Sequence, residues 1–276
     1  MILLDRLTEL FPTASRQTLK GMVQIGRVKV NGSRARRLKQ TIERTDVVLV
    51  ESLRRASDDP DFAIIFEDAD ILVIDKPPGL LTSTVPRERR PTALAAVRKY
   101  LVADHAARVG LIHRLDREAS GLLVFSKTRA AYESLKRQFF ERSAGRVYAA
   151  IVSPPPRPPR GRIDSTLVEH VDGTVHRTRL AGKGQQAVTE YETLQVVGDL
   201  AHLRVTLRTG RKHQIRAHLA GHGSPIVGDT LYGGMKDPAG LMLAAIQLQL
   251  NHPRTGRRET FQIPLPDRMT RLLKKK

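Results

Sequence analysis

Residues 110–128 read GLIHRLDREASGLLVFSKT, and this stretch places one carboxylate in a polar turn directly before an apolar run. The carboxylate is Asp116, and residues 122–125 form the run, which is typical of a buried strand. Three side chains that carry or can take up positive charge surround it: His113, Arg114 and Arg117. A buried strand can hold such a turn rigidly, so Asp116 is either a structural ion-pair partner or a reactive group.

The composition indicates a polyanionic partner. The 276 residues include 47 Lys and Arg against 28 Asp and Glu, which gives a net charge of +19. A charge of that size favours binding to nucleic acid through phosphate neutralisation and counterion release. We find no membrane-spanning or signal-like stretch, so we expect a cytoplasmic protein. Cysteine is absent, which excludes disulfides, thiolate catalysis and cysteine-based zinc sites.

Residues 1–50 are expected to form a small domain made of a helix and a hairpin. Leu19, Met22 and Val23 recur at helical spacing after Ser15, a predicted helix cap, and Asn31-Gly32 is a favoured hairpin dipeptide. The domain carries ten Lys and Arg against four acids. We interpret its cations as phosphate contacts in preference to an idle solvated face. Those assigned to RNA binding are Arg16, Lys20, Arg27 and Lys29.

This arrangement, with SRQTLKGMVQIGRVKVNG at its centre (residues 15–32), resembles the small RNA-binding domain named after ribosomal protein S-four. Residues 51–61 are polar and aperiodic, which is typical of a linker. A larger domain is expected over residues 62–268, followed by a basic tail over residues 269–276.

Local patterns in the larger domain predict mixed helices and strands, and therefore an α+β fold. Residues 153–162 contain five prolines and are expected to lack regular structure. The expected elements are a hairpin of residues 62–66 and 71–74, helices over 92–100 and 130–140, a strand over 146–152, and paired strands over 188–195 and 202–207.

A second polar cluster, TGRKHQIR, spans residues 209–216. We expect Arg211 to emerge at the start of a helix, where its planar guanidinium would suit a carboxylate or a phosphate, although a plain surface arginine is equally compatible with the spacing. His218 and His222 have the spacing of helical zinc ligands, but the acid of a hydrolytic zinc helix is missing between them. We therefore expect no metal, and no nucleophile elbow or nucleotide-binding loop occurs.

Several blocks, in order, resemble the RluA-type RNA pseudouridine synthases. They are FEDADILVIDKPPG, HRLDREASGLLVFSKT, RVYAAIVSP, AVTEYETL, RTGRKHQIRAHLAGHGSPIVGDTLYGG and LQLNHPRTG. The resemblance covers about residues 62–268. It implies a catalytic domain built on a large, mainly antiparallel mixed sheet with a central active-site cleft, and an isomerase that converts uridine to pseudouridine in structured RNA, most of all ribosomal RNA. Transfer RNA is the other candidate substrate.

The resemblance also implies roles for particular residues. It makes Asp116 the essential catalytic carboxylate, Tyr148 the residue that packs against the target base, and Arg211 the cation that pairs with Asp116. Further RNA contacts are assigned to His113, Arg114, Lys127, Lys212, His213, Gln214 and Arg216. The reaction is redox-neutral, so no cofactor is expected.

The chemistry leaves two routes open for Asp116. The carboxylate can attack the ribose or take its 2′ proton while uracil detaches, rotates and rejoins through carbon. The target base must first leave its stack, and an aromatic side chain offsets part of that cost. Two positions depart from the family pattern: Ala119 replaces a usual Thr, and Ala244 replaces a usual His. The alternative function is a non-catalytic RNA-binding or ribosome-assembly protein, and we expect a monomer.

Overall fold

A computed structural model describes residues 1–11, 16–24, 28–43, 45–50, 62–84, 90–101, 107–178, 180 and 182–274. Two compact units make up the chain: Met1–Pro60 with Arg98–Ala107, and Asp61–Val97 with Arg108–Lys276. Ser15, Arg27 and the predicted linker 51–61 lie outside the described residues. Among the described helices, none combines the length and the apolar character needed to cross a membrane.

The first unit contains two helices and a small antiparallel sheet. Asn31 and Gly32 both have positive φ, at 49° and 79°, as the tight turn of a hairpin requires. The Asn31 side chain donates to Asp46 and accepts from the Val47 amide, which ties the hairpin turn to the approach of the third strand. The described elements are α1 (Leu3–Leu10), α2 (Arg16–Gln24), β1 (Val28–Val30), β2 (Ser33–Arg34) and β3 (Val48–Val50), with strand order β2-β1-β3.

The second unit is built on a large mixed sheet, as the sequence predicted. Among the described residues, eleven strands belong to it, and the main path runs β10-β9-β11-β12-β8-β13-β7-β5-β4, with β14 beside β13 and β6 beside β7. Every pairing is antiparallel except that of β13 with β7. The strands are β4 (Ala63–Glu67), β5 (Ile71–Lys76), β6 (Gly110–Leu111), β7 (Ser120–Ser126), β8 (Gly145–Val152), β9 (Arg160–Glu169), β10 (Val175–Thr178), β11 (Gln185–Val197), β12 (Leu200–Leu207), β13 (Leu243–Asn251) and β14 (Arg258–Gln262).

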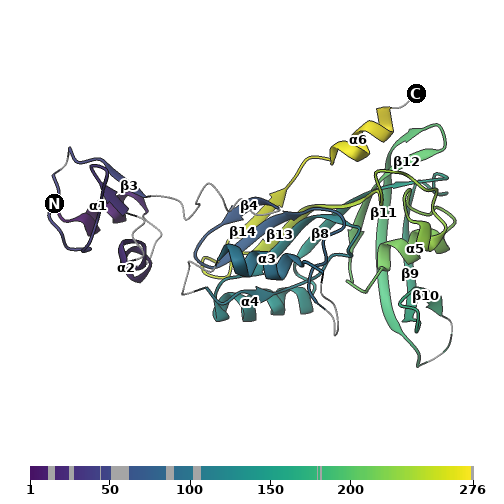
Figure 1. Ribbon diagram of the computed structural model, residues 1–276. Coiled ribbons are helices and arrows are strands. Elements are labelled where there is room, and N and C mark those ends of the chain that lie inside the picture. Colours follow the sequence, from purple (N-terminus) through teal and green to yellow (C-terminus); the bar gives the residue numbers. More distant parts are fainter. Residues whose placement is uncertain are drawn as a thin grey trace. The chain divides into compact units, whose positions relative to one another are not determined.

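Helices cover this sheet in two places. The helix α4 (Arg129–Phe140) packs on β7 and β13, and α5 (Gln214–Gly221) packs on β10 and β11 (Figure 1). Leu122 and Val124 of β7 share a buried apolar cluster with Ala131 and Leu135 of α4. The packing of α4 on β7 therefore anchors the strand that follows the Asp116 turn.

A close approach of two strands lies beside that turn. Gly121 has φ +111°, and a Cβ at this position would lie 2.2 Å from the Ala245 carbonyl oxygen of β13. Only glycine satisfies both conditions, because it has no Cβ and adopts positive φ readily. Ala244 is fully buried at the same parallel pairing, opposite Ser120.

The predicted local elements agree with the structure, and the predicted cap Thr92 accepts from the Ala95 amide at the start of α3 (Ala93–Tyr100). Two segments differ from the prediction. The proline-rich segment is irregular only to residue 159, because β9 begins at Arg160 and pairs with β11. The basic tail contains a helix, α6 (Asp267–Lys274), because Met269 and Leu273 are buried one turn apart.

Candidate active site

Asp116 lies at the wall of a cavity of about 570 Å³. That volume falls within the range of small-ligand pockets. The walls come from the Asp116 turn (residues 112–119), the C-terminal end of α4, β8, and the segment 209–215 that leads into α5. The cavity thus gathers residues that are about a hundred positions apart in sequence.

The Asp116 turn is held on both sides of the carboxylate. Thr82 donates its hydroxyl to the Leu115 carbonyl and accepts from the Leu115 amide. On the other side, the Arg117 carbonyl accepts from the Gly79 amide at 2.8 Å and from the Lys76 ammonium at 3.1 Å. The peptide units on either side of Asp116 are therefore fixed by the segment that follows β5.

Lys76 is a buried cation under this turn. Its Nζ donates to the carbonyls of Pro77, Leu80 and Arg117, and the side chain is fully buried. Burial lowers the pKa of Lys76 to about 8, and the nearby Asp116 carboxylate acts against that shift. Sequence analysis did not single out Lys76, although it ends an apolar strand immediately before two prolines.

Asp116 pairs with Arg216, and the expected pairing with Arg211 is wrong. The Arg216 Nη1 lies 3.6 Å from the Asp116 carboxylate, and the two side chains are 7% and 16% exposed. Arg211 instead donates its Nε to the Gln186 carbonyl at 3.3 Å. The helix begins at Gln214 rather than at Arg211, and His213 precedes it with φ +50°, so Arg216 is the arginine that α5 carries to the carboxylate.

Two further residues fix the Arg216 guanidinium. Its Nε and Nη2 donate to the two carboxylate oxygens of Asp229 at 2.7 and 2.8 Å, a bidentate pair that leaves Nη1 on the side of Asp116. The Tyr232 ring lies 5.0 Å from the guanidinium carbon, within cation–π range. Sequence analysis named neither residue, because nothing in GDTLYGG itself marks a contact with α5.

Gln214 explains how the turn before α5 keeps its shape. Its amide oxygen accepts from the Thr209 hydroxyl and the Arg211 amide, and its amide nitrogen donates to Val188 and Thr189. The side chain is buried. We predicted an RNA contact for Gln214. The residue lines the cavity, and these four hydrogen bonds, all made within the protein, hold the turn.

The other predicted residues lie in three places. Lining the cavity with Asp116 are His113, Arg114, Tyr148, Arg211, Lys212 and His213. Lys127 does not join them, because it is buried and forms an ion pair with Glu67 at 2.8 Å; its predicted RNA contact gives way to that pair. Arg16, Lys20 and Lys29 belong to the first unit.

Two histidines of the cavity are shifted toward the neutral form. Burial, aided by Arg146 and Lys136, lowers the pKa of His113 to about 3. Its ring stacks on Phe139 with centroids 4.7 Å apart, and its Nε2 accepts from the Val124 amide. Burial also lowers the pKa of His213, which bonds to the Tyr232 hydroxyl at 2.9 Å.

Tyr148 presents an aromatic surface rather than an acid. It lies on β8 and is almost wholly buried, and burial is the main reason that its pKa is raised. Ala119 is also buried at the cavity wall, where a hydroxyl would need a hydrogen-bond partner.

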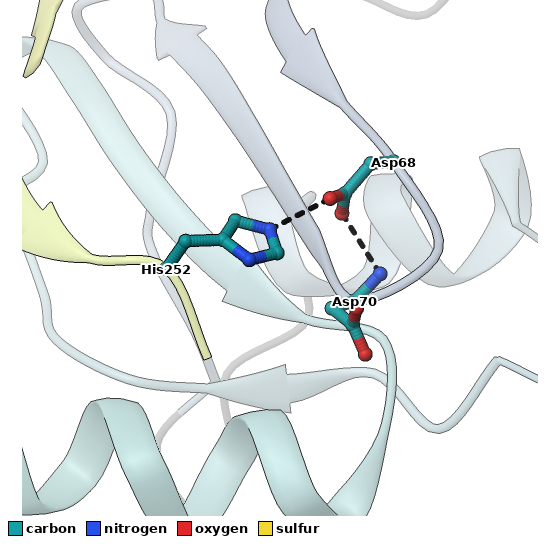
Figure 2. A group of neighbouring side chains, drawn as sticks. All are labelled: Asp68, Asp70 and His252. Carbon is teal, nitrogen blue, oxygen red and sulfur yellow. Dashed lines mark hydrogen bonds and ion pairs between the residues drawn. The ribbon is translucent and has the colours of Figure 1, made fainter. Parts of the chain in front are cut away.

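The residues that could bind a metal are occupied by protein contacts. His218 bonds to Ser165 and Thr189 through its two ring nitrogens, and His222 bonds to the Tyr191 hydroxyl. Elsewhere, Asp68, Asp70 and His252 bring three potential ligand atoms within 4.8 Å of one another (Figure 2).

These three side chains, together with Arg254, connect two turns of the chain. Asp68 accepts from His252 at 2.7 Å and from the amides of Asp70 and Ile71, while Asp70 accepts both Nε and Nη2 of Arg254. A cation there would have to displace Arg254. These contacts connect the β4–β5 turn to the turn between β13 and β14, and none of the four side chains lines the cavity.

Comparisons with known proteins agree on one family. A family model described as RNA pseudouridylate synthase matches residues 70–221, which include Asp116, Tyr148 and Arg216. The ribosomal large subunit pseudouridine synthase D of Pseudomonas aeruginosa is 35% identical over 94% of this chain and 87% of its own length. Its namesake in Haemophilus influenzae is 32% identical over 97% and 88%.

A solved structure has a similar fold. The protein named Human RNA Pseudouridylate Synthase Domain Containing 4 aligns with a TM-score of 0.62 and 27% identity, over 75% of this chain and 90% of that one.

Proposed function

The chain belongs to the RNA pseudouridylate synthase family and is an isomerase of that class, and on this premise we propose that it converts specific uridines of ribosomal RNA to pseudouridine with Asp116 as the catalytic carboxylate. The choice of ribosomal RNA rests on relatives at 32–35% identity that are named as ribosomal large subunit synthases. The observation that carries the role of Asp116 is its position at the cavity wall, paired with an arginine that is itself held by Asp229.

The reaction breaks the bond between the ribose C1′ and N1 of uracil and forms a bond from C1′ to C5. The base rotates between the two events, a proton leaves C5, and a proton arrives at N1, so atoms balance without a cofactor. Asp116 acts on the ribose, either by attack at C1′ or by removal of the 2′ proton. Both routes require the carboxylate to reach the ribose beside C1′, where the bond to uracil breaks.

The charged groups of the site are held in position before the substrate binds. Arg216 keeps its position through Asp229 and Tyr232, so it needs no rearrangement when the carboxylate reacts. Preorganised charges of this kind are worth more in a water-poor site than in solution, because the protein has already met the cost of orienting them.

The target uridine enters the cavity flipped out of its RNA stack. Extrusion costs a few kcal/mol, and stacking on an aromatic face offsets part of it. Tyr148 supplies that face from β8, beside Asp116 in the same cavity.

The first unit provides additional RNA contacts. Its exposed cations lie on the helix α2 or follow the Asn31-Gly32 turn, where they would bind phosphates: Arg16, Lys20, Arg34, Arg36, Arg37 and Lys39. Such contacts would position the RNA and leave the choice of base to the cavity. We propose that the protein acts in the cytoplasm as a monomer.

Mapping of pseudouridine tests the assignment in cells. RNA is compared from cells with the gene intact, with the gene deleted, and with Asp116→Asn, which preserves the size of the side chain. We expect one or more ribosomal sites to lose modification in both altered strains. Full modification in the Asp116→Asn strain would refute the catalytic role, and an unchanged map in the deletion strain would favour a non-catalytic RNA-binding protein.

A further inference from the structure

Phe140 is an exposed aromatic side chain on the cavity rim. It ends α4, its exposed fraction is 88%, and it belongs to the lining of the same cavity as Asp116. Isolated exposed apolar residues are common on protein surfaces and need no explanation. Phe140 differs because the residues beside it form a cationic and aromatic surface at the entrance to a site for RNA.

The surface is defined here as the α4 wall, and it consists of His113, Lys136, Phe139, Phe140, Arg142 and Arg146. Phe139 contacts two planar groups: the His113 ring at 4.7 Å on a nearly parallel plane, and the Arg146 guanidinium at 5.4 Å. Phe139 therefore already has partners within the protein. Phe140 is the adjacent aromatic residue whose surface remains uncovered.

Unused hydrogen-bond donors accompany that exposed ring. The Arg146 Nε and the His113 Nδ1 are buried and have no hydrogen-bond partner in the described part of the chain. Because the His113 Nε2 accepts from Val124, its Nδ1 carries the proton and is a donor. Buried donors without partners are costly, so the α4 wall is suited to a ligand that brings acceptors.

The cations define the chemistry of that ligand. Arg142 is exposed two residues after α4 ends, and Lys136 is exposed one turn before Phe140, where its ammonium lies 3.5 Å from the Ile112 carbonyl oxygen. A group resting on Phe140 would therefore have positive charge nearby. A nucleotide offers an aromatic base for the ring and a phosphate for the cations. An apolar peptide would satisfy only the ring.

We propose that Phe140 is the stacking platform of a second nucleotide subsite, which receives an unpaired base of the same RNA strand next to the target uridine. This proposal rests on the proposed function, because it takes the cavity floor at Asp116 and Tyr148 as the place of the reacting uridine. It adds a contact that selects RNA in which the neighbouring base is also unpaired. Phe140 binds substrate without taking part in bond making.

Fluorescence tests the contact without requiring catalysis. The chain contains no Trp, so Phe140→Trp introduces a single reporter, and Leu194→Trp places a matched reporter at an exposed position of β11 outside the cavity. The probe is a nine-nucleotide single-stranded RNA of mixed sequence, whose binding to both variants is followed independently by anisotropy of an end label. We expect saturable quenching at position 140 and none at position 194.

Quenching at neither position while anisotropy reports bound RNA would overturn the proposal, and so would equal quenching at both. Quenching of the residue 140 reporter by an added apolar peptide, with no further response to RNA, would assign the ring to a protein contact and would also overturn the proposal.

Abasic substitution then tests whether the contact is with a flanking base. In a synthetic RNA stem-loop containing the mapped target uridine, each neighbouring base is removed in turn. Stacking on an aromatic residue is worth about 1–3 kcal/mol, so we expect Phe140→Leu and one particular abasic position each to raise KM about tenfold with kcat unchanged. Combined, they should raise KM no further, because they remove the same contact.

Additive effects would show that Phe140 and that base do not touch, which would contradict the subsite. Phe140→Tyr keeps the aromatic ring and should keep the wild-type KM. A thermal unfolding curve of Phe140→Leu that matches the wild type excludes a folding defect. The two proposals fail separately: loss of activity in Asp116→Asn with no quenching at position 140 removes only the subsite, whereas quenching by RNA without any pseudouridine formation removes only the enzymatic assignment.

Discussion

Two parts of the cavity wall differ in how their polar groups are paired: the α5 side, formed by residues 209–215 together with α5, and the α4 wall. On the α5 side, Arg216 is bound by Asp229, Lys212 is paired with Glu169, and Gln214 makes four hydrogen bonds within the protein. On the α4 wall, Phe140 is exposed and Arg146 has a buried donor without a partner in the described residues. The polar groups of the α5 side are therefore held by protein partners before the substrate binds, whereas the α4 wall has groups left for the RNA to contact.

Apart from the loss of Asp116 itself, the largest effect is expected where the α5 side meets the carboxylate. Arg216→Lys retains the charge but cannot form the two-pronged contact with Asp229, so Nη1 loses its fixed position. We expect the single-turnover rate to fall by about two to three orders of magnitude, as for removal of one preorganised group at a reacting centre. The measurement is pseudouridine formed on isolated RNA by saturating enzyme.

Arg211→Lys is the matched control for this experiment. Arg211 also lines the cavity, but its guanidinium contacts a backbone carbonyl. Its loss should cost less than about tenfold in rate. A larger defect at Arg211 than at Arg216, in two variants with equal thermal stability, would reverse the assignment of the partner cation.

The arginine that pairs with Asp116 could not be predicted correctly from the sequence. Periodicity is local, so it predicted the helix α4, the β4–β5 hairpin and the Thr92 cap from neighbouring residues alone. The partner of Asp116 depends on where α5 begins, and the positive φ of His213 moves that start to Gln214. A shift of three residues changes which arginine faces the carboxylate.

Burial explains the other errors. Gln214 and Lys127 are polar residues in basic segments, and from sequence both resemble RNA contacts. Gln214 fixes a turn and Lys127 pairs with Glu67, and both are buried. The contributions of Asp229 and Tyr232 depend on contacts with α5 that have no local signature. The family membership, by contrast, was confirmed, because it rested on long blocks, whereas the Arg211 pairing that the resemblance implied rested on a single residue and was wrong.

A smaller effect is expected from pH on the α4 wall. The pKa of His113 is lowered to about 3 in the folded protein, so between about pH 6.5 and 3 the unfolded chain binds a proton that the folded chain does not. Stability therefore falls as pH falls through this window. His113 should account for about 2 kcal/mol of the loss between pH 7 and pH 5.

Urea unfolding of the wild type and of His113→Gln at both pH values measures this contribution. The variant should lose about 2 kcal/mol less than the wild type over the same interval. His218, whose pKa is lowered to about 4, remains in both proteins and cancels in the comparison. An identical pH dependence would mean that His113 takes up a proton as readily in the folded protein as in the unfolded chain, and the neutral stack on Phe139 would be wrong.

The smallest effect is expected in the first unit, whose exposed cations should act as diffuse phosphate contacts. Replacing Arg36, Arg37 and Lys39 together by Gln should weaken RNA binding severalfold and leave the rate at saturating RNA unchanged. Each lost phosphate contact reduces the slope of log affinity against log salt by about 0.7 to 0.9. An unchanged slope would show that this surface does not bind RNA.

The central claim is that Asp116, fixed by its turn and paired with Arg216, performs the isomerisation. The most direct measurement is the pseudouridine formed in a single turnover by purified Asp116→Asn on RNA isolated from cells that lack the gene, with RNA binding measured in parallel. We expect RNA binding within about threefold of the wild type and no detectable pseudouridine. Pseudouridine formed at a rate near that of the wild type would contradict the claim.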